Sequence, residues 1–124
     1  MAFVWVGLGG ALGAMARYGV GLLAGRLFGL AFPWGTLTVN VMGSFAMGLA
    51  AIWVARNLGA AEPVRLFLMT GLLGGFTTFS AFSLDAFSLW ERGQIGLAIA
   101  YVLASVVAAI LGLFAGIALG RALV

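Results

Sequence analysis

The sequence predicts an all-α integral membrane protein, with four transmembrane helices in a single domain that covers residues 1–124. Hydrophobic residues make up 65% of the chain and charged residues only 7%, whereas a soluble domain carries roughly 25% charged residues. A membrane-spanning helix needs about 20 apolar residues. The length therefore accommodates four spans joined by short loops and leaves no room for a second, soluble domain.

The residue types that are missing exclude several kinds of chemistry. The chain has no cysteine, which excludes disulfides and thiolate metal sites, and no histidine, the commonest metal ligand and proton relay. The net charge of +3 arises from charged residues scattered singly along the chain, a pattern that does not indicate nucleic-acid binding. No carboxylate pair, nucleophile–base set or phosphate-binding loop is present, so we expect no enzymatic activity.

The first predicted span runs from about Ala2 to Ala24. We interpret it as a membrane helix and not a removable signal peptide, because it lacks a basic leading segment and a clear cleavage site. Four residues recur every four positions and share one helix face: Gly9, Gly13, Arg17 and Gly21. Arg17 lies at membrane depth, where an arginine either finds a polar partner or extends to the interface, and the sequence leaves both interpretations open. A loop over residues 26–33 follows.

The second predicted span runs from about Trp34 to Ala55 and carries one polar stripe. The stripe consists of residues four apart: Thr36, Asn40 and Ser44. An unpaired amide at mid-membrane is costly, so Asn40 needs partners. It either joins two helices or donates an N–H to a permeating anion. A second loop is expected over residues 56–63.

The third apolar segment, from about Val64 to Trp90, has an unusual centre with the sequence GLLGGFTTFSAFS. Paired glycines loosen the backbone there, and two threonines add β-branched hydroxyl residues. Irregular backbone at membrane depth is tolerated only where protein covers it or where it lines a cavity. We therefore predict a helix break near Gly74–Thr78 that forms a site. A kinked helix with hydroxyl groups bonded back to its own backbone is the alternative.

The fourth predicted span runs from about Ile95 to Leu119. Tyr101 and Ser105 are four residues apart and share a face, and the tyrosine hydroxyl lies deep enough to need a partner. A repeat of glycines at the same spacing predicts close helix packing: Gly112, Gly116 and Gly120.

The arginines outside the spans barely specify an orientation. Three of them would flank the side of the N-terminus (Arg56, Arg65 and Arg121) and two the opposite side (Arg26 and Arg92). A clear bias is needed to fix topology. The near tie predicts that the chain inserts in both orientations and forms an antiparallel two-fold homodimer.

Four motifs in this order resemble the Fluc (CrcB) family of fluoride channels, and the resemblance covers nearly the whole chain. The motifs are GxxGAMARY in the first span, WGTLTVNVMGSF in the second, GLLGGFTTFSAFS in the third and YxxxS in the fourth. The resemblance implies a prokaryotic multi-pass protein of the cell membrane that releases fluoride passively and protects the cell from its toxicity. It also implies an antiparallel dual-topology homodimer with two pores and a structural sodium ion at its centre.

The resemblance also implies roles for individual residues. Phe79 and Phe82 match the paired rings that face fluoride, and Asn40 matches the pore asparagine. Further polar residues match pore-lining positions: Thr36, Ser80, Ser83, Tyr101 and Ser105. Arg17 matches a vestibule arginine, and Gly74 and Thr77 match the positions whose main-chain carbonyls hold sodium. The chain departs from the family at Ala81, where many members carry threonine, and at Asp85, where glutamate is frequent.

The residue types suit a small, strongly hydrated anion. Amide N–H and hydroxyl groups replace water as compact donors, and phenylalanine edges carry the positive side of the ring quadrupole. Two other functions stay open from the residues alone. One is a proton-coupled exporter of cationic compounds, which would need a membrane-embedded carboxylate. The other is a non-transporting assembly subunit, for which the glycine faces would suffice.

Overall fold

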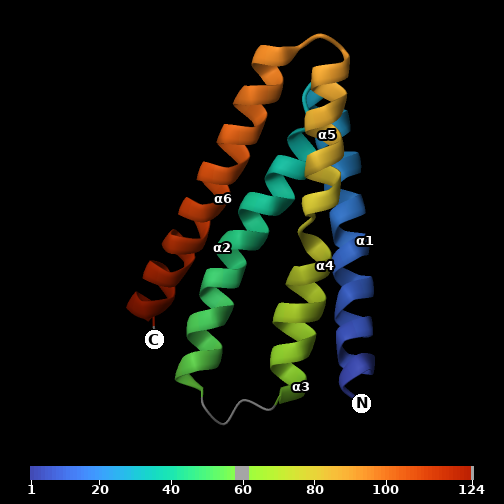
Figure 1. Cartoon of the computed structure of the whole chain (residues 1–124). Helices are drawn as coiled ribbons and strands as arrows, with labels where there is room; N and C mark the ends of the chain where they lie inside the picture. Colours follow the sequence, from blue (N-terminus) through green and yellow to red (C-terminus); the bar gives the residue numbers. More distant parts are fainter. Residues whose placement is uncertain (58–61, 124) are drawn as a thin grey trace.

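Residues 1–57 and 62–123 are described by a computed structural model, and this part of the chain is all-helical. Four segments are long and apolar enough to cross a membrane, as predicted: Ala2–Phe28, Trp34–Arg56, Glu62–Glu91 and Ile95–Leu123. Both termini lie at the same end of the bundle, and the third segment runs between the first and second (Figure 1). The predicted loop over residues 56–63 falls partly on residues 58–61, which lie outside the described residues.

The first, second and fourth segments are continuous helices: α1 (Ala2–Phe28), α2 (Trp34–Arg56) and α6 (Ile95–Leu123). The starts of α2 and α6 agree with the prediction, but α1 and α6 each continue four residues beyond their predicted ends. Arg26 therefore lies in the last turn of α1 and not in a loop. The helix ends where Gly29 adopts a positive φ of 78° and its N–H bonds to the carbonyl of Gly25.

The third segment is composite. It begins with the short helix α3 (Glu62–Arg65), continues as the π-helix η1 (Leu66–Leu73) and the single turn α4 (Gly74–Phe76), and resumes as α5 (Phe79–Glu91). The predicted break is confirmed, and it is confined to Thr77 and Thr78 (Figure 1).

The paired glycines of the third segment do not loosen the backbone, contrary to our interpretation of them. Gly74 and Gly75 are helical, and the Cβ that a larger residue would add at Gly75 would lie 2.6 Å from the carbonyl oxygen of Gly10. On α1, a Cβ at Gly9 or Gly13 would likewise meet the main chain of the third segment. These glycines allow two backbones to touch, which is their commoner use in membrane helices.

A second glycine-lined contact joins α2 and α6, as predicted from the spacing. A Cβ added at Gly48 would meet the carbonyl oxygen of Leu113, and one added at Gly116 would meet that of Phe45. The bundle therefore consists of two closely packed helix pairs, α1 with the third segment and α2 with α6.

Candidate functional site

Two consecutive residues at the break are extended. Thr77 has φ −89° and ψ 159°, and Thr78 has φ −152° and ψ 123°. The Oγ1 of Thr78 accepts the N–H of Ala81 at 3.1 Å, so it caps the N-terminus of α5. The hydroxyl of Thr77 donates to the carbonyl of Leu73 at 3.1 Å. The two threonines thus end one helix and begin the next.

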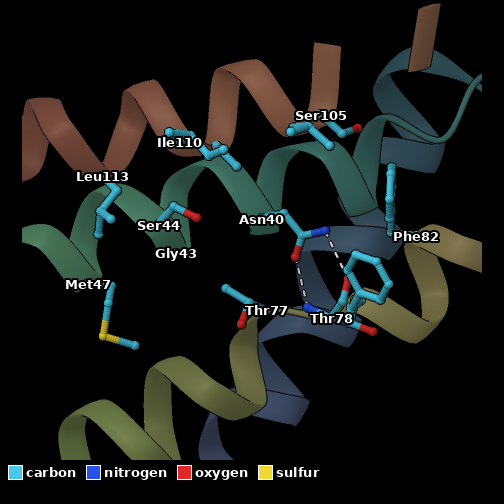
Figure 2. Close-up of a pocket in the computed structure, with 13 residues that line it drawn as sticks. Asn40, Gly43, Ser44, Met47, Thr77, Thr78, Phe82, Ser105, Ile110 and Leu113 are labelled. Carbon is cyan, nitrogen blue, oxygen red and sulfur yellow. Dashed lines mark hydrogen bonds between the residues drawn. The ribbon is translucent and has the colours of Figure 1, made fainter. Parts of the chain in front are cut away.

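The side chain of Asn40, on α2, holds the break in place (Figure 2). Its Nδ2 donates to the carbonyl oxygen of Thr78 at 2.9 Å, and its Oδ1 accepts the N–H of Thr78 at 2.8 Å. The amide therefore joins two segments that are 38 residues apart in the sequence, which is the interhelical role considered for it. Nδ2 carries two hydrogens, and the described residues engage only one of them, so the second donor remains for another acceptor.

Arg17 also bonds to the third segment. Its Nε donates to the carbonyl oxygen of Gly75 at 3.1 Å, which decides for a polar partner over extension to the interface. A crevice of about 290 Å³ lies beside it and reaches Thr36, Thr78 and Ala81. Thr36 of the polar stripe lines the same crevice, and the vestibule role of Arg17 stays a prediction.

A groove of about 470 Å³ opens on the other side of Asn40, between the break, α2 and α6 (Figure 2). Five residues from the predicted site contribute to it: Asn40, Thr77, Phe79, Phe82 and Ser105. Ser44 of the polar stripe lies farther along, and the remaining lining is largely apolar, with Met47, Ile110 and Leu113 among it. The structure thus places predicted residues from three segments on one concave surface.

The rings of Phe79 and Phe82 lie side by side, as their spacing predicted for a helix that resumes after the break. Their centroids are 5.5 Å apart and their planes are inclined by 56°. Phe82 is 8% exposed, whereas Phe79 is 77% exposed in this single chain. The pair therefore connects the interior of the bundle to its surface.

Tyr101 is fully buried and lies behind Phe82, with ring centroids 5.3 Å apart, so it does not line the groove directly. Its hydroxyl donates to Oδ2 of Asp85 at 3.1 Å. The hydroxyl groups of Thr36 and Ser105 lie beside it. The sequence places Asp85 near the far end of its span and indicates no partner, since nothing local links it to a residue 16 positions away.

The three predicted serines differ in their surroundings. Ser105 lines the groove and is 5% exposed, yet its Oγ is buried without a well-formed hydrogen bond among the described residues. Ser83 is exposed and donates to the carbonyl of Phe79 at 3.0 Å, and Ser80 is exposed with its Oγ 3.3 Å from that of Thr78. Ser105 is therefore the one of the three whose hydroxyl forms no well-formed hydrogen bond within the described residues, although the Tyr101 hydroxyl lies beside it.

The carbonyl groups of Gly74 and Thr77 lose the helical donors that would ordinarily reach them. In an α-helix these donors are the N–H groups four residues on, those of Thr78 and Ala81. Here the first bonds to Asn40 and the second to the Thr78 side chain. Within residues 1–57 and 62–123 no cluster of three or more acidic, His or Cys side chains could hold a metal.

One residue near the site was not identified from the sequence. Phe32, in the connection between α1 and α2, packs edge-to-face on Tyr101 at a centroid distance of 5.5 Å and 90°. In the sequence, a loop phenylalanine beside Pro33 and Trp34 cannot be distinguished from an ordinary aromatic residue at the membrane interface. The only signal in the sequence is that two aromatic residues, Phe32 and Trp34, flank Pro33.

Four apolar spans with a polar break inside the third define a small multi-pass integral membrane protein. The chain belongs to the CrcB family, because residues 4–117 match the family described as "CrcB-like protein, Camphor Resistance (CrcB)". A protein of Agrobacterium fabrum named "Fluoride-specific ion channel FluC" is 60% identical over 116 residues, which cover 94% of this chain and 93% of the relative. A relative of the same name from Rhodopseudomonas palustris is 58% identical over 123 residues, 99% of both chains.

A third relative, "Fluoride-specific ion channel FluC 2" of Nitrobacter hamburgensis, is 55% identical over 121 residues, 98% of both chains. The resemblance stated from the four motifs is thereby confirmed. The relatives are bacterial and their names denote ion channels, which are not enzymes. Together with the four spans, this makes the chain a multi-pass membrane protein of prokaryotic type.

Proposed function

We propose that this protein is a channel for passive fluoride efflux that protects the cell from fluoride toxicity. The observation that carries the proposal is the groove at the break, where the Phe79–Phe82 pair meets Asn40 and Ser105. Among the described residues the Asn40 amide uses only one of its two N–H groups, and the buried Ser105 hydroxyl forms no well-formed hydrogen bond. The names of the relatives support the same ion.

The groove offers fluoride a way to exchange its hydration shell for protein donors. Asn40 is held by two hydrogen bonds to Thr78, so its second N–H has a fixed direction and costs little reorganisation when an anion arrives. The Ser105 hydroxyl is free to rotate toward the same ion. Ring edges at Phe79 and Phe82 add a weak positive surface, and weak contacts favour release, which conduction requires.

The backbone contributes a favourable field. α5 begins at Phe79, beside the groove, and its N-terminus carries the positive end of the helix dipole. Because the helix is interrupted at membrane depth, this positive N-terminus lies inside the membrane and not at its surface. Arg17 adds a full positive charge at the opposite side of the break, next to the second crevice. An anion crossing this level therefore meets partial and full positive charge from two directions.

We also propose that two copies assemble as an antiparallel homodimer. Phe79 is largely exposed, and Ser80 and Ser83 beside it are exposed as well, so a partly polar face lies open at membrane depth, where protein covers such faces better than lipid. A second copy would cover this surface and close the open groove into a pore. Tags on the termini, probed for accessibility in intact membranes, should report both orientations. One orientation throughout would contradict the antiparallel arrangement.

A structural sodium ion at the centre of that dimer belongs to the same proposal. The carbonyls of Gly74 and Thr77 fit a hard cation, because side chains have taken their helical donors and Gly74 is exposed. A bound cation would lower the electrostatic cost of a nearby anion. Crystals grown with a heavier monovalent ion in place of sodium should show anomalous signal between the two breaks, and a water there would count against the ion.

The decisive experiment is ion flux from purified protein in liposomes. Vesicles loaded with fluoride should release it on addition of a potassium ionophore, with chloride-loaded vesicles as the control, and a fluoride electrode records the rate. Release of a cationic dye driven by a proton gradient, without fluoride release, would support the exporter instead. Absence of both fluxes from folded protein would support an assembly subunit.

A further inference from the structure

We propose that Phe32, in the connection between α1 and α2, is a positioning residue that holds the Phe82 ring at the groove through Tyr101. The inference rests on the proposed fluoride channel, since it gives Phe82 its function. Phe32 itself does not line the groove, and any effect it has on conduction must pass through the rings between them.

Four aromatic rings form a continuous row from the loop to the groove. Phe32 packs on Tyr101 at a centroid distance of 5.5 Å, Tyr101 on Phe82 at 5.3 Å, and Phe82 on Phe79 at 5.5 Å. All three distances lie in the range in which aromatic pairs attract one another. Tyr101 is fully buried, and Phe32 belongs to the set of partly buried side chains packed around it and Phe82. A displacement of the first ring is therefore passed to the next.

Phe32 is fixed at its outer side as well. The carbonyl of its neighbour Ala31 accepts a hydrogen bond from Nη2 of Arg92 at 3.3 Å, which links the loop to the end of α5. The ring of Trp34 lies 4.7 Å from that of Phe32, and the N–H of Trp34 bonds to the carbonyl of Phe32 at 2.8 Å. The side chain therefore enters the bundle from an anchored loop.

Phe82 is supported by this row of rings on the side that faces away from the groove. One side of the ring faces the groove, and Tyr101 lies behind it. Tyr101 is attached at its hydroxyl by Asp85, but its ring is kept in place by packing, with Phe32 at 90° to it. Removal of the Phe32 ring leaves a cavity behind Tyr101. Both inner rings can then move away from the groove, since cores relax partly into such cavities.

The first test compares Phe32→Leu with Phe28→Leu in the fluoride-release assay. Phe28 is a matched control: it lies at the same end of the bundle and contacts Trp34 at 5.8 Å, but it is 62% exposed and has no ring contact with Tyr101. We expect fluoride release to slow by more than twofold and up to about tenfold in Phe32→Leu, which is the range of population change produced by losing one aromatic pair. Phe28→Leu should stay within about twofold of the natural sequence. Equal rates in the two variants would overturn the inference.

The second test reads the position of residue 82 itself. A 4-fluorophenylalanine introduced at Phe82 gives a ¹⁹F resonance that can be recorded without fluoride ion. Phe32→Leu should shift or broaden this resonance, whereas Phe28→Leu should leave it unchanged. A general loss of stability would not distinguish the two variants in this way. A resonance that is the same in all three proteins refutes the positioning role, even if the rate falls.

If Phe32→Leu fails to fold, Arg92→Gln tests the same idea by releasing the loop with the ring retained. Its control is Arg26→Gln, which removes one positive charge at the same end of the bundle. We expect slower release and a broadened resonance only for Arg92→Gln, and equal behaviour of both variants would refute the inference. If the natural sequence releases no fluoride, the channel proposal itself fails, and the resonance still reports whether Phe32 positions residue 82.

Discussion

Replacing Asn40 by aspartate separates the two roles of its amide at the break. The substitution retains an oxygen for the N–H of Thr78, now 2.8 Å from Oδ1, but removes the Nδ2 donor that bonds to the carbonyl oxygen at 2.9 Å. It also places a carboxylate at the groove. Asn40→Ala is the companion variant, because it removes both hydrogen bonds and adds no charge.

The structure gives different magnitudes for the two changes. Interhelical hydrogen bonds in membrane proteins contribute about 0.6 kcal/mol on average and at most about 1.7, so loss of both bonds in Asn40→Ala should destabilise the fold by about 1–3 kcal/mol. An ionised carboxylate roughly 4 Å from fluoride adds a repulsion of about 4 kcal/mol at an effective dielectric constant near 20. That repulsion would slow conduction by a factor of about 10³.

The two variants can be distinguished by measuring both flux and stability. Fluoride release from liposomes should fall far more in Asn40→Asp than in Asn40→Ala. Unfolding in denaturing detergent should show Asn40→Asp at least as destabilised as Asn40→Ala, because the aspartate retains one bond but sets a carboxylate oxygen against the carbonyl oxygen of Thr78 at membrane depth. Near-normal fluoride release in folded Asn40→Asp would mean that the ion does not pass this groove.

The packing and the site support three further predictions. Phe79→Ile and Phe82→Ile retain apolar bulk at a packing loss of less than about 1.5 kcal/mol but delete the ring edge. Fluoride release should therefore collapse while the variants elute in size exclusion at the volume of the natural sequence. Isoleucine variants that conduct would show that the rings only fill space. Arg17→Gln removes the bond to the main chain at the break and also removes the positive charge of the side chain. Both the rate of fluoride release and the free energy of unfolding should therefore fall, the free energy by about 1–3 kcal/mol. Arg17→Lys, which retains the charge, should recover part of the rate. Gly116→Leu forces a side chain into the α2 backbone, whereas Gly96→Leu enters open space, so only the former should lower the yield of folded protein, and equal yields would contradict the close α2–α6 contact.

The spans could be predicted from the sequence because length and apolarity determine them almost alone. Trp34 and Ile95 are the starts of their helices, as predicted. The predicted ends came too early because they coincided with the edge of the apolar run. The last turns of α1 and α6 carry Arg26 and Arg121 beyond that edge, and α1 continues until Gly29 reverses the backbone.

The position of the break could be predicted, but its cause could not. Glycines and threonines occur together in the sequence, and a local argument assigns the irregularity to the glycines. In the structure Gly71 and Gly75 pack against α1, and the extended conformation at Thr78 is stabilised by Asn40 from a different helix. Such a partner cannot be identified from the residues around the break. The same holds for the Arg17 bond to Gly75, because the sequence is compatible both with a polar partner for this arginine and with its extension to the membrane interface.

The residues that touch the ion stay a prediction, for a related reason. Spacing placed Phe79 and Phe82 together, and the structure agrees. Whether Ser80 and Ser83 face a pore depends on a second copy, since both lie on the open surface of one protomer. The sequence pattern of a single chain does not show what covers that surface.

The π-helix at Leu66–Leu73 has a consequence for how the chain tolerates changes in length. A π turn closes its hydrogen bond over one more residue than an α turn, so it accommodates an extra residue without rotating the rest of the segment. Deletion of one residue within this stretch could convert a π turn to an α turn and leave the threonines of the break facing Asn40. The same deletion in α2 would turn Asn40 by about 100° relative to one end of its helix. The third segment is thus the part of the bundle where evolution can change the length of the chain and retain the register of the site.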